Sequence, residues 1–150
     1  MIIDRMGVSH LLDYGCGQLS LGKHLKANHP LKYQAYDPGI EKYSTPPVPA
    51  EMVACIDVLE HIEPDCLEAV LDDLKRLTEG ILFATVATGP ARKTLSDGRN
   101  AHLIQEPMSW WIPKFFERFD VQSMTRTEHG FVIVAYAKSQ LQGVNGEMLG

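Results

Sequence analysis

The chain has 150 residues, enough for one domain with a single core, and its 45% apolar and 22% charged residues are ordinary for a soluble globular protein. A formal net charge of −5 argues against a surface for duplex nucleic acid, which needs clustered Lys and Arg. No apolar run approaches the roughly 20 residues of a membrane span, and the first residues lack the apolar region of a signal peptide. The three cysteines have no metal-site spacing, so we expect reduced thiols in a cytoplasmic protein.

Strand-like and helix-like segments alternate in the first half of the chain. Three short segments predict strands, the apolar one at 10–14 and two more at 32–36 and 51–57. Between the first two, residues 19–30 predict a helix with Ser20 as its N-cap and Pro30 closing its exit.

The clearest helical pattern lies at 63–80, where one apolar stripe contains Leu67, Val70, Leu71, Leu74 and Leu77. Pro64 suits the first turn of this helix, and Gly80 suits its C-terminal exit. A buried strand is predicted at 81–87, followed by a long polar loop at 88–106.

A second apolar stripe predicts a further helix, with Trp111, Ile112, Phe115, Phe116 and Phe119. Pro113 is tolerated there if Ser109 is the N-cap, because the proline then falls in the first turn. Segments 120–128 and 131–138 flank His129-Gly130 and predict an antiparallel hairpin. We expect one domain over 1–138 and a flexible tail over 139–150.

Alternating strand-helix units predict a Rossmann-like, doubly wound α/β fold, with a mostly parallel sheet and a closing antiparallel hairpin. Ligands of such sheets bind outside the carboxyl ends of the strands. Gly15, Asp37 and Asp57 all follow strand ends, so this edge of the sheet is the expected site.

The stretch "LLDYGCGQLSLGKHL" (11–25) resembles a nucleotide-binding turn between a strand and a helix. Asp37 follows about 20 residues after Gly17, where an acidic side chain can accept both hydroxyls of a ribose. Leu19 and Ser20 stand where a dinucleotide site has its third glycine, and the bulk of Leu19 would crowd a pyrophosphate. The alternative is a tight structural turn with a solvated Asp37.

Three motifs resemble those of the class I S-adenosylmethionine (AdoMet)-dependent methyltransferases. "LLDYGCG" (11–17) is similar to their first motif and "YQAYDPG" (33–39) to their second, while "MVACIDVLEHIEP" (52–64) resembles the fourth-strand motif of the small-molecule enzymes. The terminal hairpin matches the antiparallel seventh strand of that family, which dinucleotide-binding domains lack. The resemblance spans residues 10–138 and implies AdoMet as the cofactor.

Position by position, the resemblance implies a cofactor site made of Asp13, Gly15, Cys16, Gly17, Asp37, Pro38, Asp57 and Val58. The glycines would lie against the methionine part of AdoMet, with Asp13 organising the turn near its amino group. Asp37 would take the ribose hydroxyls, and Pro38 would lie near the adenine.

The sequence also departs from the family. Leu19 replaces the third glycine of the first motif, and residues 38–50 are too few for the usual helix, strand and helix. The adenine-binding acid of that strand therefore has no counterpart, and the N-terminal helices that cover the site are reduced. Either the cofactor binds with modest affinity, or the partner in a homodimer closes the pocket.

Methyl transfer from a sulfonium needs mainly orientation, and a base only if the acceptor must lose a proton. His61 and His102 are the candidate catalytic residues. The alternatives are a helix-entry histidine bonded to backbone for His61 and a solvated loop for His102. Arg99 and Asn100, in the donor-rich loop, and Trp110, off the apolar stripe, are candidate substrate-binding residues.

The expected acceptor is a small, possibly anionic molecule. The sequence lacks the Asn/Asp-Pro-Pro-aromatic motif of exocyclic-amine DNA methyltransferases and the Pro-Cys of cytosine-C5 enzymes, so no nucleic-acid partner is expected. A degenerate AdoMet-binding or assembly module without activity is the main alternative. A nicotinamide-dependent oxidoreductase is a third, opposed by Leu19 and the hairpin.

Overall fold

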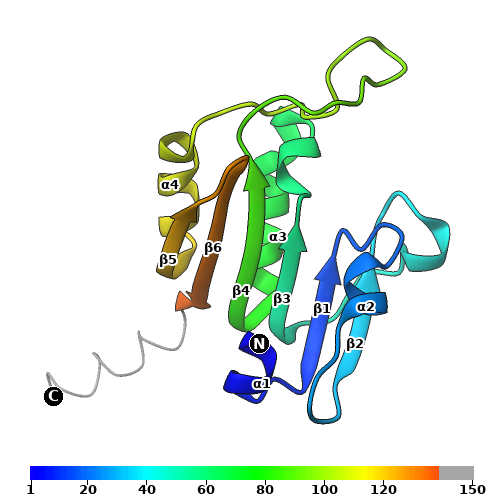
Figure 1. The fold of residues 1–150 in the computed structure, drawn as a ribbon, viewed down its shortest axis with the longest axis vertical. Coiled ribbons are helices and arrows are strands. Elements are labelled where there is room, and N and C mark those ends of the chain that lie inside the picture. The colour runs from blue at the N-terminus through cyan, green and yellow to red at the C-terminus, as the bar shows by residue number, and fades with distance from the viewer. Residues whose placement is uncertain (139–150) are drawn as a thin grey trace, which may run out of the picture.

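The computed structural model describes residues 1–138, and the predicted tail at 139–150 lies outside the described residues (Figure 1). Within this range six strands form one sheet in the order β2-β1-β3-β4-β6-β5. Their bounds are β1 His10–Tyr14, β2 Lys32–Tyr36, β3 Ala50–Ile56, β4 Thr78–Ala87, β5 Phe119–Arg126 and β6 Gly130–Ala137. The first four strands are parallel, and β6 pairs antiparallel with both β4 and β5. The predicted doubly wound sheet with a C-terminal hairpin is confirmed.

Helices cover the two faces of the sheet unequally (Figure 1). They are α1 Ile2–Met6, α2 Ser20–His24, α3 Leu67–Leu77 and α4 Met108–Phe116. The two longer helices, α3 and α4, pack on one face, and the two five-residue helices pack on the other. None of the described helices is long and apolar enough to cross a membrane.

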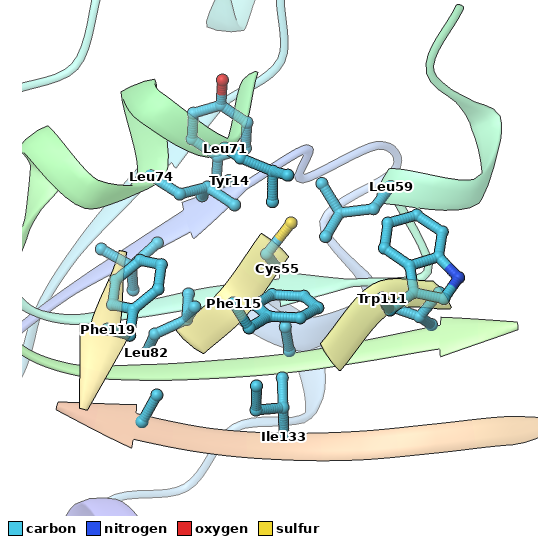
Figure 2. Packing of buried hydrophobic residues seen from close by; sticks show 14 of the residues in the cluster. Tyr14, Cys55, Leu59, Leu71, Leu74, Leu82, Trp111, Phe115, Phe119 and Ile133 are labelled. Atoms are coloured by element: carbon cyan, nitrogen blue, oxygen red, sulfur yellow. The ribbon is translucent and has the colours of Figure 1, made fainter. Parts of the chain in front are cut away.

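The main core lies between the sheet and the pair α3 and α4 (Figure 2). Leu71 and Leu74 of α3 and Trp111 and Phe115 of α4 are fully buried there. The opposite face is thinner, since several of its apolar side chains are only partly buried: Ile56, Phe83, Val134 and Tyr136. The helices α3 and α4 therefore cover the sheet more fully than the two short helices do.

The predicted ends of two helices were wrong. Helix α2 begins at Ser20 with Leu19 as its N-cap and ends at His24, so Ser20 is not a cap and Pro30 does not close the helix. Helix α3 follows a short 3-10 turn at Pro64–Cys66 and ends at Leu77.

Gly80 lies inside β4 rather than at a helix exit. A Cβ atom on this glycine would meet the carbonyl oxygen of Glu51 at 2.7 Å, beside a shift in the register of β3 and β4. The residue is therefore glycine because the two strands approach closely there.

The boundaries of α4 also differ from the prediction. Pro107, not Ser109, is the N-cap, so Pro113 lies beyond the first turn and cannot donate the helical hydrogen bond. Phe119 belongs to β5, and Phe116 is 51% exposed. The buried stripe of this helix is consequently narrower than the sequence pattern indicated.

Candidate functional site

The glycine turn after β1 is fastened to the end of β2. The amides of Gly15 and Cys16 donate to the carbonyl of Tyr36, at 2.7 and 3.0 Å. The Gly17 amide donates to Oδ2 of Asp37 at 3.0 Å, and the Gly39 amide donates to Oδ1 at 2.9 Å. Asp37 therefore joins the two predicted motifs directly, at the carboxyl ends of neighbouring strands.

Gly15 is the position in this turn with the least room. Its φ of 79° lies in the left-handed region, and a Cβ atom would meet Cγ2 of Val58 at 2.4 Å. Gly17 also has a positive φ, of 51°, but nothing lies within 4 Å of the position its Cβ would take. The turn thus needs glycine at one position for space and conformation, and at the other for conformation alone.

Leu19 occupies the place of the missing third glycine in a left-handed conformation, with φ 62° and ψ 34°. Few residues other than glycine adopt this conformation, because Cβ approaches the following carbonyl oxygen. The turn therefore keeps the backbone conformation that glycine would adopt, although the residue there is leucine. Leu19 is strained as a result.

We expect Leu19→Gly to be more stable than Leu19→Ala by about 1–2 kcal/mol, the cost of the left-handed conformation for a non-glycine residue. Both variants lose the packing of the leucine side chain beyond Cβ, so a more stable glycine variant, despite the greater entropy of its unfolded chain, reports the backbone strain. Urea unfolding of the two variants measures it. Equal stabilities would show that Leu19 is unstrained in solution.

Beneath the turn lies a buried polar group, Asp13, which is 4% exposed. Its carboxylate accepts a hydrogen bond from the Tyr33 hydroxyl. Burial raises the pKa of Asp13, the bond from Tyr33 opposes that rise, and the charge of Asp37 adds to it. Burial also raises the pKa of the neighbouring Cys16 thiol to about 11, so Cys16 is a neutral thiol at pH 7.

Two hollows flank the glycine turn. One of about 300 Å³ is lined by Tyr14, Gly15, Asp37, Pro38, Asp57, Val58, His61, Ile62 and Val70. The other, of about 480 Å³, is lined by Asp13, Gly15, Cys16, Ser20, Leu21, His24, Ile56 and Asp57. All the predicted cofactor residues except Gly17 line one of these hollows, and Gly17 bonds to Asp37.

Asp57 is shared by both hollows and has a left-handed backbone, with φ 54°. Its amide donates to Oγ1 of Thr85 at 3.0 Å, and that hydroxyl donates to Oδ1 of Asp57 at 2.9 Å. Aspartate tolerates this conformation better than most residues. Thr85, on β4, was not singled out in the sequence, although it fixes the orientation of Asp57.

A third hollow, of about 680 Å³, adjoins the first through Asp57 and His61. His61 and His102 both line it, with their rings edge to face at 4.8 Å between centroids. Nδ1 of His61 lies 2.9 Å from the carbonyl oxygen of Ala101, and Nδ1 of His102 lies 2.7 Å from that of Gly89. A carbonyl only accepts, so each Nδ1 carries a proton and each neutral ring keeps Nε2 as an acceptor.

Glu60 lies beside the two histidines and was not identified from the sequence. It is fully buried, and Oε1 accepts the Ala87 amide at 3.2 Å, whereas Oε2 has no hydrogen-bond partner among the described residues. Burial raises the pKa of Glu60, and backbone hydrogen bonds partly oppose this. Its place in "VLEHI" was visible, but its burial depends on tertiary packing.

The predicted substrate-binding residues lie outside the hollows, although Asn100 accepts a hydrogen bond at 2.9 Å from the amide of His102, which lines the third one. Arg99 pairs with Glu63 at 2.7 Å and with Asp97 at 2.8 Å. The side chain of Asn100 bonds both the amide and the carbonyl of Ala91, each at 2.9 Å. Trp110 is 37% exposed and packs against Trp111 and Lys114. None of these three predicted residues lines the hollows described above.

Comparison with solved structures identifies the fold. DhpI in complex with SAH matches with a TM-score of 0.59 and 18% identity, over 85% of this chain and 76% of that one. An O-methyltransferase family protein from Burkholderia thailandensis matches with a TM-score of 0.66 and 14% identity, over 86% of this chain and 51% of that one. The chain has the class I methyltransferase fold.

A third structure with the class I methyltransferase fold is 1,6-didemethyltoxoflavin-N1-methyltransferase from Burkholderia thailandensis, solved with 1,6-didemethyltoxoflavin and S-adenosylhomocysteine bound. It matches with a TM-score of 0.59 and 15% identity, over 90% of this chain and 74% of that one. No family model and no curated protein matches the sequence. The predicted fold resemblance is thus confirmed by structure, at identities too low to carry over a function.

Proposed function

We propose that this chain is an AdoMet-dependent methyltransferase that acts on a small molecule. The observation that carries the proposal is the junction of the glycine turn with Asp37, at the carboxyl ends of β1 and β2. This is the place where parallel α/β sheets bind their ligands. In support, two of the similar structures were solved with S-adenosylhomocysteine (SAH) bound.

The two hollows beside the turn would receive the cofactor. We place its methionine part against Gly15 and Gly17, above the buried Asp13, and its ribose at Asp37 with the adenine near Pro38. The Asp37 carboxylate has about four lone-pair sites, and the amides of Gly17 and Gly39 use two of them. Sites therefore remain for ribose hydroxyls.

His61 and His102 are the proposed catalytic pair. His61 lines both the first and the third hollow, so it lies where an acceptor in the third hollow would meet the cofactor. The Nδ1 contacts of both histidines leave Nε2 available to the acceptor side. The cofactor would supply the methyl group, while the chain would orient the two reactants, which accounts for about 7–11 kcal/mol of barrier in favourable cases.

The third hollow suits a small acceptor, since its volume of about 680 Å³ is typical of small-molecule sites. Arg92 lines it and could pair with an anionic group. Arg99, Asn100 and Trp110 stay predictions as substrate-binding residues, with the Arg99 guanidinium already held by two carboxylates.

An inactive module is the second candidate. The strained Leu19 and the thin cover of one sheet face favour it, because both would weaken a cofactor site. In the segment between β2 and β3 the structure has only the 3-10 turn Glu41–Tyr43. Homodimerisation would then be a means of completing the pocket, as the sequence suggested.

Calorimetric titration with S-adenosylhomocysteine tests the proposal. We expect the wild type to bind and Asp37→Ala to bind about 100-fold more weakly, since hydrogen bonds to a charged group contribute about 1.5–3 kcal/mol each. Asp37→Asn keeps an oxygen acceptor and should lose less. Asp120→Ala, on the exposed edge strand, is the matched control and should bind as the wild type does.

Absence of binding to the wild type at millimolar ligand would reject the enzyme for the isolated chain and favour the module. Equal binding by the wild type and Asp37→Ala would place the ligand elsewhere on the chain.

A further inference from the structure

Three side chains gather in the third hollow in a way that the methyl-transfer proposal does not require. The residues are Glu60, His61 and His102. Each offers one possible ligand atom, and these three atoms lie within 4.8 Å of one another. Glu60 and His61 come from the turn after β3, and His102 comes from the long loop after β4. The loop is held to that turn by the Ile104 amide, which donates to the Glu60 carbonyl at 3.1 Å.

The buried Glu60 points to a missing partner. Its side chain is 0% exposed, and Oε2 makes no hydrogen bond with any described residue. A buried carboxylate without a partner is costly, and buried charges in proteins are paired or bind metals. The Ala87 amide donates to Oε1 of Glu60 and leaves Oε2 without a donor among the described residues.

Both histidines are oriented as metal ligands usually are. A ligating imidazole commonly donates its second N–H to a backbone carbonyl, which fixes the tautomer and the ring. Here Ala101 and Gly89 supply these carbonyls, at 2.9 and 2.7 Å from the two Nδ1 atoms. Two Nε2 lone pairs and one carboxylate oxygen are thereby left as donors.

We propose that Glu60, His61 and His102 bind one divalent transition-metal ion. Two imidazoles and one carboxylate suit first-row ions such as Zn²⁺, Co²⁺, Mn²⁺ or Fe²⁺, whereas Mg²⁺ prefers oxygen ligands. The three donor atoms lie within 4.8 Å of one another, so a small inward movement of the side chains would bring each to the roughly 2.0–2.2 Å from a shared ion that such ligands adopt. His61 is exposed and His102 is half-buried, so the ion can enter from the open hollow.

A role for this ion in methyl transfer rests on the proposed function, whereas the binding of the ion to these three side chains does not. With three protein ligands, the ion would keep at least one open position, where it could hold an oxygen of an acceptor in the third hollow. An imidazole that coordinates through Nε2 cannot accept a proton there. His61 and His102 would then act on the acceptor through the ion and not as bases.

Titration of the tag-free, metal-free protein with Co²⁺ tests the site by visible absorbance and calorimetry, with no cofactor present. We expect one ion per chain, a spectrum without thiolate charge transfer, and no displacement by Mg²⁺. His102→Ala should weaken binding by at least the ~10–100-fold that loss of a partner outside the ligand shell causes. Glu60→Gln, which keeps an acceptor for the Ala87 amide, should do the same.

Two controls separate this site from adventitious binding. His129→Ala removes an imidazole that lines the same hollow and is 86% exposed, and Cys66→Ser removes the exposed thiol. Both should bind Co²⁺ as the wild type does. Unchanged binding in His102→Ala, or loss of binding in either control, overturns the proposal, provided that thermal unfolding shows each variant to be folded.

Titration of S-adenosylhomocysteine into the metal-free wild type distinguishes the two proposals. Metal binding without cofactor binding rejects only the proposed function. Cofactor binding without metal binding rejects only the metal site.

Discussion

Gly15→Ala is expected to abolish binding of S-adenosylhomocysteine and to lower the free energy of unfolding by about 2–5 kcal/mol. Two effects add in this variant. The left-handed backbone, with φ 79°, costs a non-glycine residue about 1–2 kcal/mol, and the new methyl would lie 2.4 Å from Cγ2 of Val58, an overlap that costs about 1–3 kcal/mol. Relief of the overlap must move either the turn or the Val58 segment, and both line the proposed cofactor hollow.

A second variant separates the two effects. Val58→Ala removes both γ carbons and leaves Cβ, which lies 3.3 Å from the added methyl. The double variant Gly15→Ala/Val58→Ala should therefore recover the steric part of the loss and keep the backbone part. Gly17→Ala, with a positive φ and no neighbour within 4 Å, is the control for backbone strain alone.

Urea unfolding and calorimetry on these variants give both readouts. If Gly15→Ala were no less stable than Gly17→Ala, the contact between the turn and Val58 would not exist in solution. If it bound the ligand normally, the turn would not be part of the cofactor site.

The fold and the edge of the sheet that carries the site were predictable because their signals are local. Strands end at residues that break them, so Gly15, Asp37 and Asp57 could be placed at strand ends from the sequence alone. Parallel strands then bring these residues together. The bond from the Gly17 amide to Asp37 is the geometric result of that rule.

The ends of the helices were less predictable because tertiary contacts decide them. Residues 25–29 continue a helical pattern, but the chain leaves α2 at His24, and His29 then bonds the Val8 carbonyl. Gly80 looked like a helix exit because its contact with Glu51, on another strand, has no signature in the local sequence.

The cluster of Glu60, His61 and His102 was predictable only in part. The histidines were recognised one at a time, but their contact joins two loops that the sheet brings together, and no motif spacing describes it. Glu60 could not be recognised, because its lack of a partner is a property of buried packing. Figure 1 shows the loop between β4 and α4, which supplies His102, rising above the strand ends.

The second large effect concerns that helix. Trp111→Ala is expected to lower the free energy of unfolding by about 3–5 kcal/mol, the cost of truncating a buried aromatic side chain. Trp111 is 0% exposed and packs against Phe115 and Phe131, within the core that Figure 2 shows. Since domains of this size are stable by only about 5–15 kcal/mol, this loss is a large fraction of the total.

Trp110→Ala is the matched control, because it removes the same side chain from the neighbouring position. Trp110 is 37% exposed, and we expect its loss to cost about 1 kcal/mol or less. The same pair of variants tests the predicted substrate role of Trp110: a raised KM for the acceptor with unchanged stability would support that role. Urea unfolding of both variants gives the stabilities, and equal losses would contradict the arrangement of α4.

Trp111 also connects stability to the site. Its indole N–H donates to the carbonyl of Glu106 at 3.3 Å, which fastens the end of the long loop to α4. The same loop places the Ala101 and Gly89 carbonyls against the two histidines. Trp111→Phe keeps most of the packing but not this bond. We therefore expect it to weaken Co²⁺ binding by a larger free energy than the free energy of unfolding that it costs. Loss of Co²⁺ binding only in step with unfolding would show that the loop holds its place without the indole.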